Sequence, residues 1–162
     1  MLQSEQYEYA GARTLVLLHE RHLRKFLEAW NYAKAAEVRL PETTDPDYAS
    51  LDALLRHVLA CARSYMVWIC EKLDLPDPEI EPAPDEEAIE MRSADYLEHL
   101  LQRWRRPLSQ VPERAFFDRS YPSRWKTEYC VDAMLEHAIL HPMRHTFQLR
   151  ELAEKEGKET PP

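Results

Sequence analysis

Residues 127–155 read TEYCVDAMLEHAILHPMRHTFQLRELAEK, and this stretch decides the fold class that we expect. Apolar or histidine side chains recur in it at steps of three or four residues, which is the period of one helix face. They are Met134, Leu135, Ala138, His141, His145, Leu149 and Leu152. Thr127, an N-cap residue followed by Glu128, predicts where the helix begins, and Gly157 predicts a C-cap just past its end. The stretch therefore predicts one long amphipathic helix.

Three earlier segments show the same period. The first covers about residues 7–36, the second begins after Ser50 and runs to about residue 73, and the third begins near Ser93 and ends before Pro107. The loop at 111–126 carries several aromatic residues, so we expect it to pack on the body of the protein. Four amphipathic helices of this length predict an all-α four-helix bundle, with residues 1–162 forming a single domain.

The connector between the second and third helices bears on their order. Residues 74–90 hold Pro76, Pro78, Pro82 and Pro84 among many acids, which indicates an extended chain. About 19 such residues at ~3.3 Å each would span a bundle of ~30 Å. A long crossover is therefore feasible, and it would make helices two and three parallel in an up-down-down-up order. The default up-down-up-down order remains the alternative.

Composition excludes several classes of function. The 162 residues include 2 glycines, too few for a P-loop or a dinucleotide-binding turn. A net charge of −8 argues against nucleic-acid binding, which needs a basic face. Three cysteines without a CxxC pair are typical of a reduced compartment. Since we find neither a signal peptide nor an apolar run of ~20 residues, we expect a cytoplasmic protein that binds no membrane.

The histidines are the residues of this sequence that indicate a metal site. His137, His141 and His145 follow one another at steps of four in the last helix, and two imidazoles at that spacing can bind one metal ion. His57 lies on the apolar face of the second helix and is the best third ligand. In antiparallel helices, His57 and His145 would lie at comparable depths of roughly 10 and 16 Å, with His141 one turn deeper. Three imidazoles leave coordination positions open and suit zinc, nickel, iron or copper.

The remaining candidates are weighed against simpler roles. We expect His22 to face inward and to contact the ligands from behind, and His19 and His99 to lie at the surface or its boundary. Tyr65 and Gln148 are candidates for the wall of a pocket, with packing as the simpler alternative for both. For the histidines, the alternative is a core polar group whose hydrogen bonds are satisfied inside the protein.

Two segments resemble the DinB-like family of metal-dependent hydrolases and thiol transferases. Residues 54–60, LLRHVLA, resemble the family's apolar helix with one metal histidine. Residues 134–149, MLEHAILHPMRHTFQL, resemble its second motif, an HxxxH pair followed by a glutamine. The resemblance implies an up-down-down-up bundle and a divalent metal, nickel or zinc before iron or manganese. It also implies His57, His141 and His145 as ligands, while His137 matches a frequent histidine that is not a usual ligand.

The same resemblance implies a function. It points to a metal-dependent enzyme that acts on a small electrophile, as a thiol-dependent S-transferase or isomerase or as a hydrolase. It further implies a low-molecular-weight thiol as cosubstrate, and a homodimer. Two alternatives stay open: a metal-stabilised binding or stress-response module without turnover, and a metal-free helical interaction protein. The sequence departs from the family at Phe147, where a glycine is frequent and a bulky ring would separate closely approaching helices.

Pro142 is the second irregularity. Eleven of the 12 prolines lie outside the expected helices or at their ends, but Pro142 stands between His141 and His145. Proline has no N–H to donate to the carbonyl of Ala138, so we expect a local kink in the last helix. The kink would turn His141 toward the metal; the alternative is a tolerated kink without a role.

Overall fold

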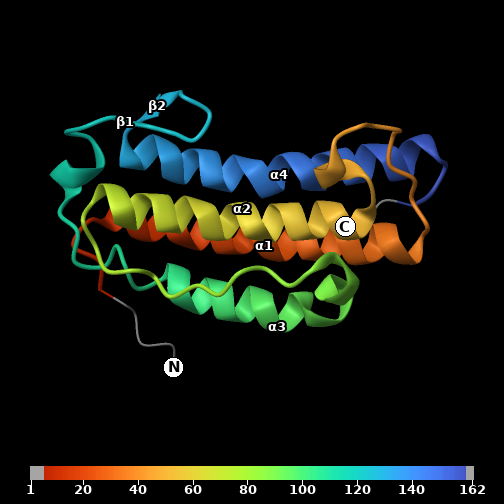
Figure 1. Cartoon of the computed structure of the whole chain (residues 1–162), viewed down its shortest axis with the longest axis horizontal. Coiled ribbons are helices and arrows are strands. Elements are labelled where there is room, and N and C mark those ends of the chain that lie inside the picture. Colours follow the sequence, from red (N-terminus) through yellow and green to blue (C-terminus); the bar gives the residue numbers. More distant parts are fainter. Residues whose placement is uncertain (1–5, 160–162) are drawn as a thin grey trace.

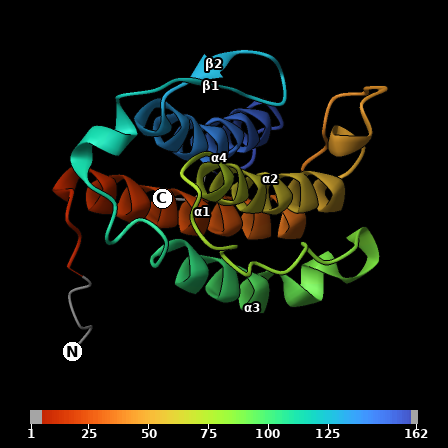
Figure 2. The ribbon, with the colours of Figure 1, turned by 60° about the vertical axis from the view of Figure 1, so that its left-hand side comes forward.

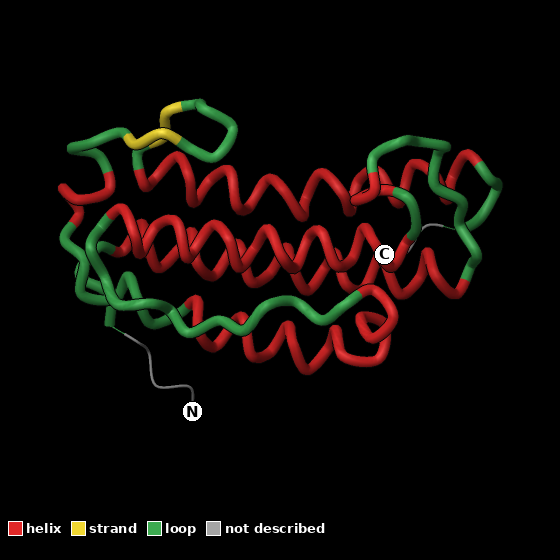
Figure 3. The backbone as a smooth tube through the Cα atoms, viewed as in Figure 1, coloured by secondary structure: helices red, strands yellow, loops and turns green. Residues whose placement is uncertain are grey.

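The protein is mostly helical. A computed structural model describes residues 6–159, and the long elements in this range are α1 (Ala10–Ala35), α2 (Leu51–Lys72), α3 (Glu86–Trp104) and α4 (Val131–Lys155) (Figure 1). The short ones are the 3₁₀-helices η1 (Pro46–Tyr48) and η2 (Glu113–Phe116) and the strands β1 (Tyr121–Pro122) and β2 (Glu128–Tyr129) (Figure 3). The predicted all-α four-helix arrangement is confirmed.

The helices run in the up-down-down-up order. α1 and α4 point one way, and α2 and α3 point the opposite way, as both ribbon views show (Figures 1 and 2). α2 ends at Lys72 and α3 begins at Glu86, and residues 73–85 run back along the bundle between them. Because α2 and α4 are antiparallel neighbours, residues far apart in the sequence meet at one level.

Two helix ends agree closely with the sequence. The Ser50 hydroxyl accepts a hydrogen bond from the backbone N–H of Ala53 at 2.9 Å, so it is the N-cap of α2. At the end of α4, Gly157 has a φ of 71°, and Lys158 N–H donates to the carbonyl of Ala153. These are the features of a helix that ends in a left-handed glycine.

The predicted start of α3 is wrong. The helix begins at Glu86 and not near Ser93, because acidic residues that the sequence analysis assigned to the connector form its first turn. Glu86 and Glu87 are favoured there by the positive end of the helix dipole. Ile89, which is fully buried, extends the apolar face by one turn.

The predicted start of α4 is also wrong. Thr127 lies in a turn and does not cap a helix, since its N–H donates to the hydroxyl of Ser123 and its carbonyl accepts from the N–H of Ser123. Residues 128–129 then form β2, which pairs antiparallel with β1. The helix begins three to four residues later, at Val131, where the first fully buried apolar side chain of α4 lies.

One hydrophobic core joins all four helices. Its largest fully buried side chains include Phe26 and Trp30 of α1, Trp104 of α3 and Phe116 of the loop after α3. The predicted packing of the aromatic loop is thus confirmed for Phe116, whereas Phe117 and Trp125 are about half exposed. None of the helices described between residues 6 and 159 is long and apolar enough to cross a membrane.

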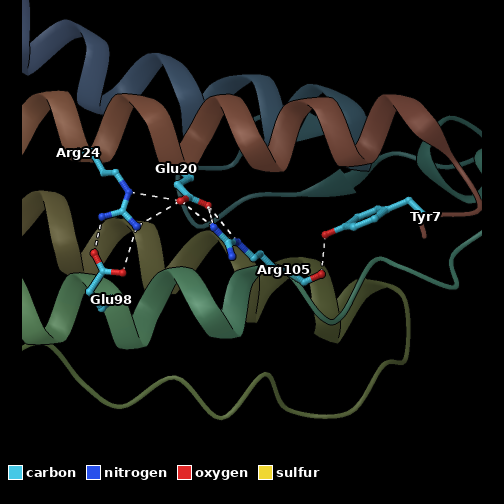
Figure 4. A network of polar contacts seen from close by, with 5 residues as sticks. All are labelled: Tyr7, Glu20, Arg24, Glu98 and Arg105. Carbon is cyan, nitrogen blue, oxygen red and sulfur yellow. Dashed lines mark hydrogen bonds and ion pairs between the residues drawn. The ribbon is translucent and has the colours of Figure 1, made fainter. Parts of the chain in front are cut away.

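A polar network ties α1 to α3 on the other side of the bundle from α4 (Figure 4). Glu20 accepts hydrogen bonds from Arg24 and from Arg105, and Arg24 also forms an ion pair with Glu98. The hydroxyl of Tyr7 donates to the backbone carbonyl of Arg105. The network holds the C-terminal end of α3 against the middle of α1. It thereby stabilises the bundle in which α2 and α4 lie.

Candidate metal centre

Three histidines from two helices converge inside the bundle. His57 of α2 and His141 and His145 of α4 each offer one ring nitrogen, and these nitrogens all lie within 4.8 Å of one another. The spacing of four residues on α4 brings two of the rings to successive turns, with centroids 4.8 Å apart. The antiparallel partner α2 supplies the third ring at the same level. The structure thus brings together the three residues that the sequence analysis selected as ligands.

The separation between two of the rings fits a single bound ion. The Nε2 atoms of His57 and His141 are 3.1 Å apart. Two imidazole nitrogens bound to one ion at ~2.0–2.1 Å would be about 2.8–3.4 Å apart, from right-angle to tetrahedral geometry. A hydrogen bond between the two rings would give a similar distance. The third histidine is therefore the observation that separates the two interpretations.

His145 has its metal-facing nitrogen unused. Its Nδ1 lies 2.9 Å from the side-chain oxygen of Gln148, so Nδ1 carries the proton and donates it there. The lone pair then lies on Nε2, which is buried and has no hydrogen-bond partner among residues 6–159. A buried acceptor without a partner is costly unless something binds it. His145 is only 2% exposed, so bulk solvent does not supply the missing hydrogen bond to Nε2.

The other two rings complete the donor set. The Nδ1 atom of His57 lies 3.0 Å from the carboxylate of Asp47, an arrangement that leaves Nε2 of His57 free to act as a ligand. The Nδ1 atom of His141 is buried and unpartnered within the part of the chain that the structure describes. Contacts to a carboxylate or an amide on the far nitrogen are what metal-binding histidines usually have. The residues present therefore fit a metal ion.

Burial keeps the two α4 histidines of the cluster neutral. Loss of solvent, followed by the neighbouring His145 and His57, lowers the pKa of His141 from 6.5 to about 2. Loss of solvent likewise lowers the pKa of His145 to about 4, although its hydrogen bond to Gln148 acts in the opposite direction. Neutral imidazole is the form that binds metals. Both α4 ligands are thus in the ligating form throughout the neutral range.

Aromatic and sulfur-containing side chains surround the cluster. The ring of Tyr48 lies 5.4 Å from that of His57 and 5.7 Å from that of His145. Tyr65, which is 7% exposed, lies 5.9 Å from the ring of His141, so the predicted pocket candidate does border the cluster. The sulfur of Cys61 is 3.9 Å from both ring nitrogens of His57, and burial raises the pKa of this thiol to about 11.

Two predicted candidates lie outside the three-histidine cluster. His137 stacks on Trp125 at 5.0 Å, and its ring lies 5.5 Å from that of Tyr65, which borders the cluster. His22 is half-buried on α1 and is not among the residues that offer a ligand atom. Gln148, which the sequence analysis named as a candidate for the wall of a pocket, does contact the cluster. Its side-chain oxygen accepts a hydrogen bond from His145.

Several sequence-based expectations about single residues need correction. His19 is not at the surface: it is 1% exposed and its ring stacks on that of Trp104 at 3.7 Å. Phe147 does not separate packed helices, since it points outward and is 65% exposed. The kink expected at Pro142 stays a prediction: α4 is helical through this buried residue, whose carbonyl accepts a hydrogen bond from the hydroxyl of Thr146 at 2.8 Å.

Three residues at the cluster escaped the sequence analysis. Asp47 and Tyr48 lie in η1, a turn whose place beside α2 no periodic pattern reveals. The one local signal is Asp45, whose carboxylate caps η1 by accepting from the N–H of Asp47. Cys61 had a usable signal, because it follows His57 by four residues on the same helix.

Comparisons with models of protein families, with curated proteins and with solved structures give no match for this chain. The DinB-like resemblance of residues 54–60 and 134–149 accordingly stays a prediction. The functional argument rests on the geometry of the three histidines and of the residues around them.

Proposed function

We propose that His57, His141 and His145 bind one divalent metal ion. The observation that carries this proposal is the convergence of three imidazoles within 4.8 Å, with the inward nitrogen of His145 buried and unpartnered within residues 6–159. Supporting it, Asp47 and Gln148 contact the far nitrogens of two of the rings, as expected for metal ligands. An all-imidazole donor set suits zinc, nickel, iron or copper, and the resemblance to the DinB-like family ranks nickel and zinc before iron and manganese.

We further propose that the protein is a metal-dependent enzyme acting on a small electrophile, in line with its resemblance to the DinB-like family. A metal held by three protein ligands leaves room for a water or a low-molecular-weight thiol and lowers the pKa of either one. The chain itself supplies a wall of Tyr48, Tyr65 and Cys61 around that space. Transfer of a thiol to the electrophile, its isomerisation, or its hydrolysis are the reactions in question.

A second function deserves a test of its own, namely a metal-stabilised binding module without turnover. It is favoured by the engagement of the carboxylate nearest to the cluster, because Asp47 lies against Nδ1 of His57 and is not available as a general base. In this case, removal of the metal would lower the melting temperature, and assays of thiol conjugation or ester hydrolysis would give no product above background.

The decisive experiment is elemental analysis of the purified protein and of three single variants, His57→Ala, His141→Ala and His145→Ala. We expect about one equivalent of metal in the wild type and a loss of most of it in each variant. His22→Ala is the matched control, since this histidine lies on α1 outside the cluster, and it should keep its metal. Full metal occupancy in His141→Ala would show that the assignment is wrong.

Two further predictions belong with this proposal. A cytoplasmic location agrees with three free thiols, Cys61, Cys70 and Cys130, and would be tested by fractionation of cells that express the protein. A homodimer, which the resemblance implies, would appear as a species of twice the 19.2 kDa chain mass in sedimentation velocity experiments.

A further inference from the structure

An open cavity of about 470 Å³ adjoins the histidine cluster. His145 and Tyr48 form part of its wall, so one end of the cavity meets the cluster. From there its lining follows α4 as far as Lys155. The 11 steps from Arg144 to Lys155 correspond to about 16 Å of helix, so the cavity is elongated along α4. Its volume is that of an ordinary small-molecule site.

Most of the exposed surface inside this cavity is apolar. Leu149 and Leu152 of α4 face Leu54 of α2, and Leu40 and Pro41 of the loop after α1 close the wall. Such a surface binds a hydrocarbon body by removing it from water, at no cost in buried polar groups. The walls therefore favour an apolar chain or ring over a sugar or a nucleotide.

The end of the cavity near the cluster carries the guanidinium of Arg144, and one carboxylate, that of Glu42, also belongs to the lining. Arg144 is exposed, and no hydrogen bond or ion pair of its side chain occurs with residues 6–159. The residues four before and four after it, Leu140 and Gln148, are uncharged. Lys155, at the other end, has Glu151 four residues before it, a spacing at which opposite charges offset each other. Arg144 is thus the cation left available to a ligand.

Arg144 also lies next to the cluster. It directly precedes His145 on α4, and both residues line the cavity. A ligand group bound by Arg144 would therefore lie beside the histidine cluster, with the remainder of the ligand between the leucines.

We propose that this cavity binds a small carboxylate with an apolar body, and that Arg144 holds the carboxylate beside the histidine cluster. A planar guanidinium matches a carboxylate with two parallel hydrogen bonds, which a lysine or a neutral donor cannot do. The inference rests on the proposed function in one respect, that the cluster is the reactive end of the cavity. It narrows the small electrophile of that proposal to one that carries a carboxylate.

Octanoate and octanamide are suitable probes, because they have nearly the same shape and differ in charge. Each would be titrated calorimetrically into the wild type, into Arg144→Gln and into Arg92→Gln, which removes another exposed arginine, from α3. We expect octanoate to bind the wild type about tenfold more tightly than octanamide does. Arg144→Gln should abolish this preference, and Arg92→Gln should keep it. Equal octanoate affinity in Arg144→Gln and the wild type would overturn the proposal.

A second measurement locates the probe. Methyl resonances of Leu149 and Leu152 should shift on addition of octanoate, because both side chains line the cavity. Shifts confined to leucines elsewhere would contradict the assignment even if octanoate bound.

The titrations are made with metal-free and with zinc-loaded protein, so that the two proposals can fail separately. If zinc does not bind but octanoate binding depends on Arg144, the metal centre is wrong and the carboxylate site stands. If zinc binds at the three histidines but octanoate shows no dependence on Arg144, the metal centre stands and the carboxylate site is wrong.

Discussion

Among residues 6–159, Nδ1 of His145 has a hydrogen-bond partner and Nε2 has none, and this difference determines what each nitrogen can do. Gln148, three residues later on α4, accepts the proton of Nδ1 and so presents the lone pair of Nε2 to the interior. Asp47 has the corresponding position at Nδ1 of His57, but it comes from η1 and not from the same helix. The orientation of one ligand is thus encoded locally, and that of the other depends on the tertiary fold.

Removal of the Gln148 amide should weaken metal binding without unfolding the protein. In Gln148→Leu, Nδ1 of His145 loses its acceptor, and we expect zinc affinity to fall by about 10–100-fold, as for other partners of metal-bound histidines. A competitive titration with a chromophoric chelator measures the change. Gln102→Leu on the exposed side of α3 is the matched control. Unchanged affinity in Gln148→Leu would mean that this hydrogen bond does not support the site.

His19 should make the stability of the protein depend on pH. Burial, with a smaller contribution from His22, lowers the pKa of His19 from 6.5 to about 3, and neither ring nitrogen has a partner among residues 6–159. Above pH 6.5, His19 is neutral in the folded and the unfolded chain, so it has no effect. Below pH 6.5, the unfolded chain binds a proton that the folded protein does not, and the free energy of unfolding falls as the pH falls.

Between pH 7 and pH 5, this residue should lower the free energy of unfolding by about 2 kcal/mol, from about 1.36 kcal/mol per pH unit below 6.5. His19→Leu removes the titrating group and keeps a buried side chain of similar size. The variant should therefore lose about 2 kcal/mol less than the wild type over this range, as measured by urea unfolding at the two pH values. The same pH dependence in both proteins would contradict the prediction.

At the scale of helices and strands, the period of apolar residues predicted those helix boundaries that are set by packing against the core. α1 and α2 begin and end close to the predicted residues because their apolar faces extend to the caps, as at Ser50. The start of α3 was misplaced because the acids at Glu86 and Glu87 resemble a solvated linker in the sequence, although the helix dipole stabilises them. The start of α4 was misplaced because β2 depends on pairing with β1, a contact that no helical pattern records.

The candidate site likewise has residues that could be predicted from the sequence and residues that could not. Its three histidines could be selected from the sequence because they lie on helix faces with regular spacing. In antiparallel helices, the number of residues from the helix end also gives the depth of each histidine in the bundle. Asp47 and Tyr48 could not, since η1 reaches the cluster only through the path of the loop after α1. A loop residue belongs to no periodic pattern, so the sequence does not indicate where in the fold its side chain lies.

At the scale of the whole molecule, the topology places the site between two helices that the crossover makes antiparallel to each other. Residues 73–85 carry the chain back along the bundle, so α3 begins at the same end as α2, and α4 then runs against α2 (Figure 1). A bound metal would therefore join two elements separated by about half of the sequence. It would act as a cross-link in the folded protein that the unfolded chain lacks.

This cross-link should make the melting temperature depend on metal. A ligand that binds only the folded state at 100 times its dissociation constant adds about 2.7 kcal/mol to the free energy of unfolding. For a chain of this size, that corresponds to an increase of about 5–10 °C in the melting temperature. Circular dichroism melts of zinc-loaded and EDTA-treated protein measure the difference. It should vanish in His141→Ala, which lacks a buried ligand, and persist in His22→Ala, whose histidine lies outside the cluster. Equal melting temperatures with zinc and with EDTA in the wild type would argue that the three imidazoles are core polar groups and that the bundle is complete without metal.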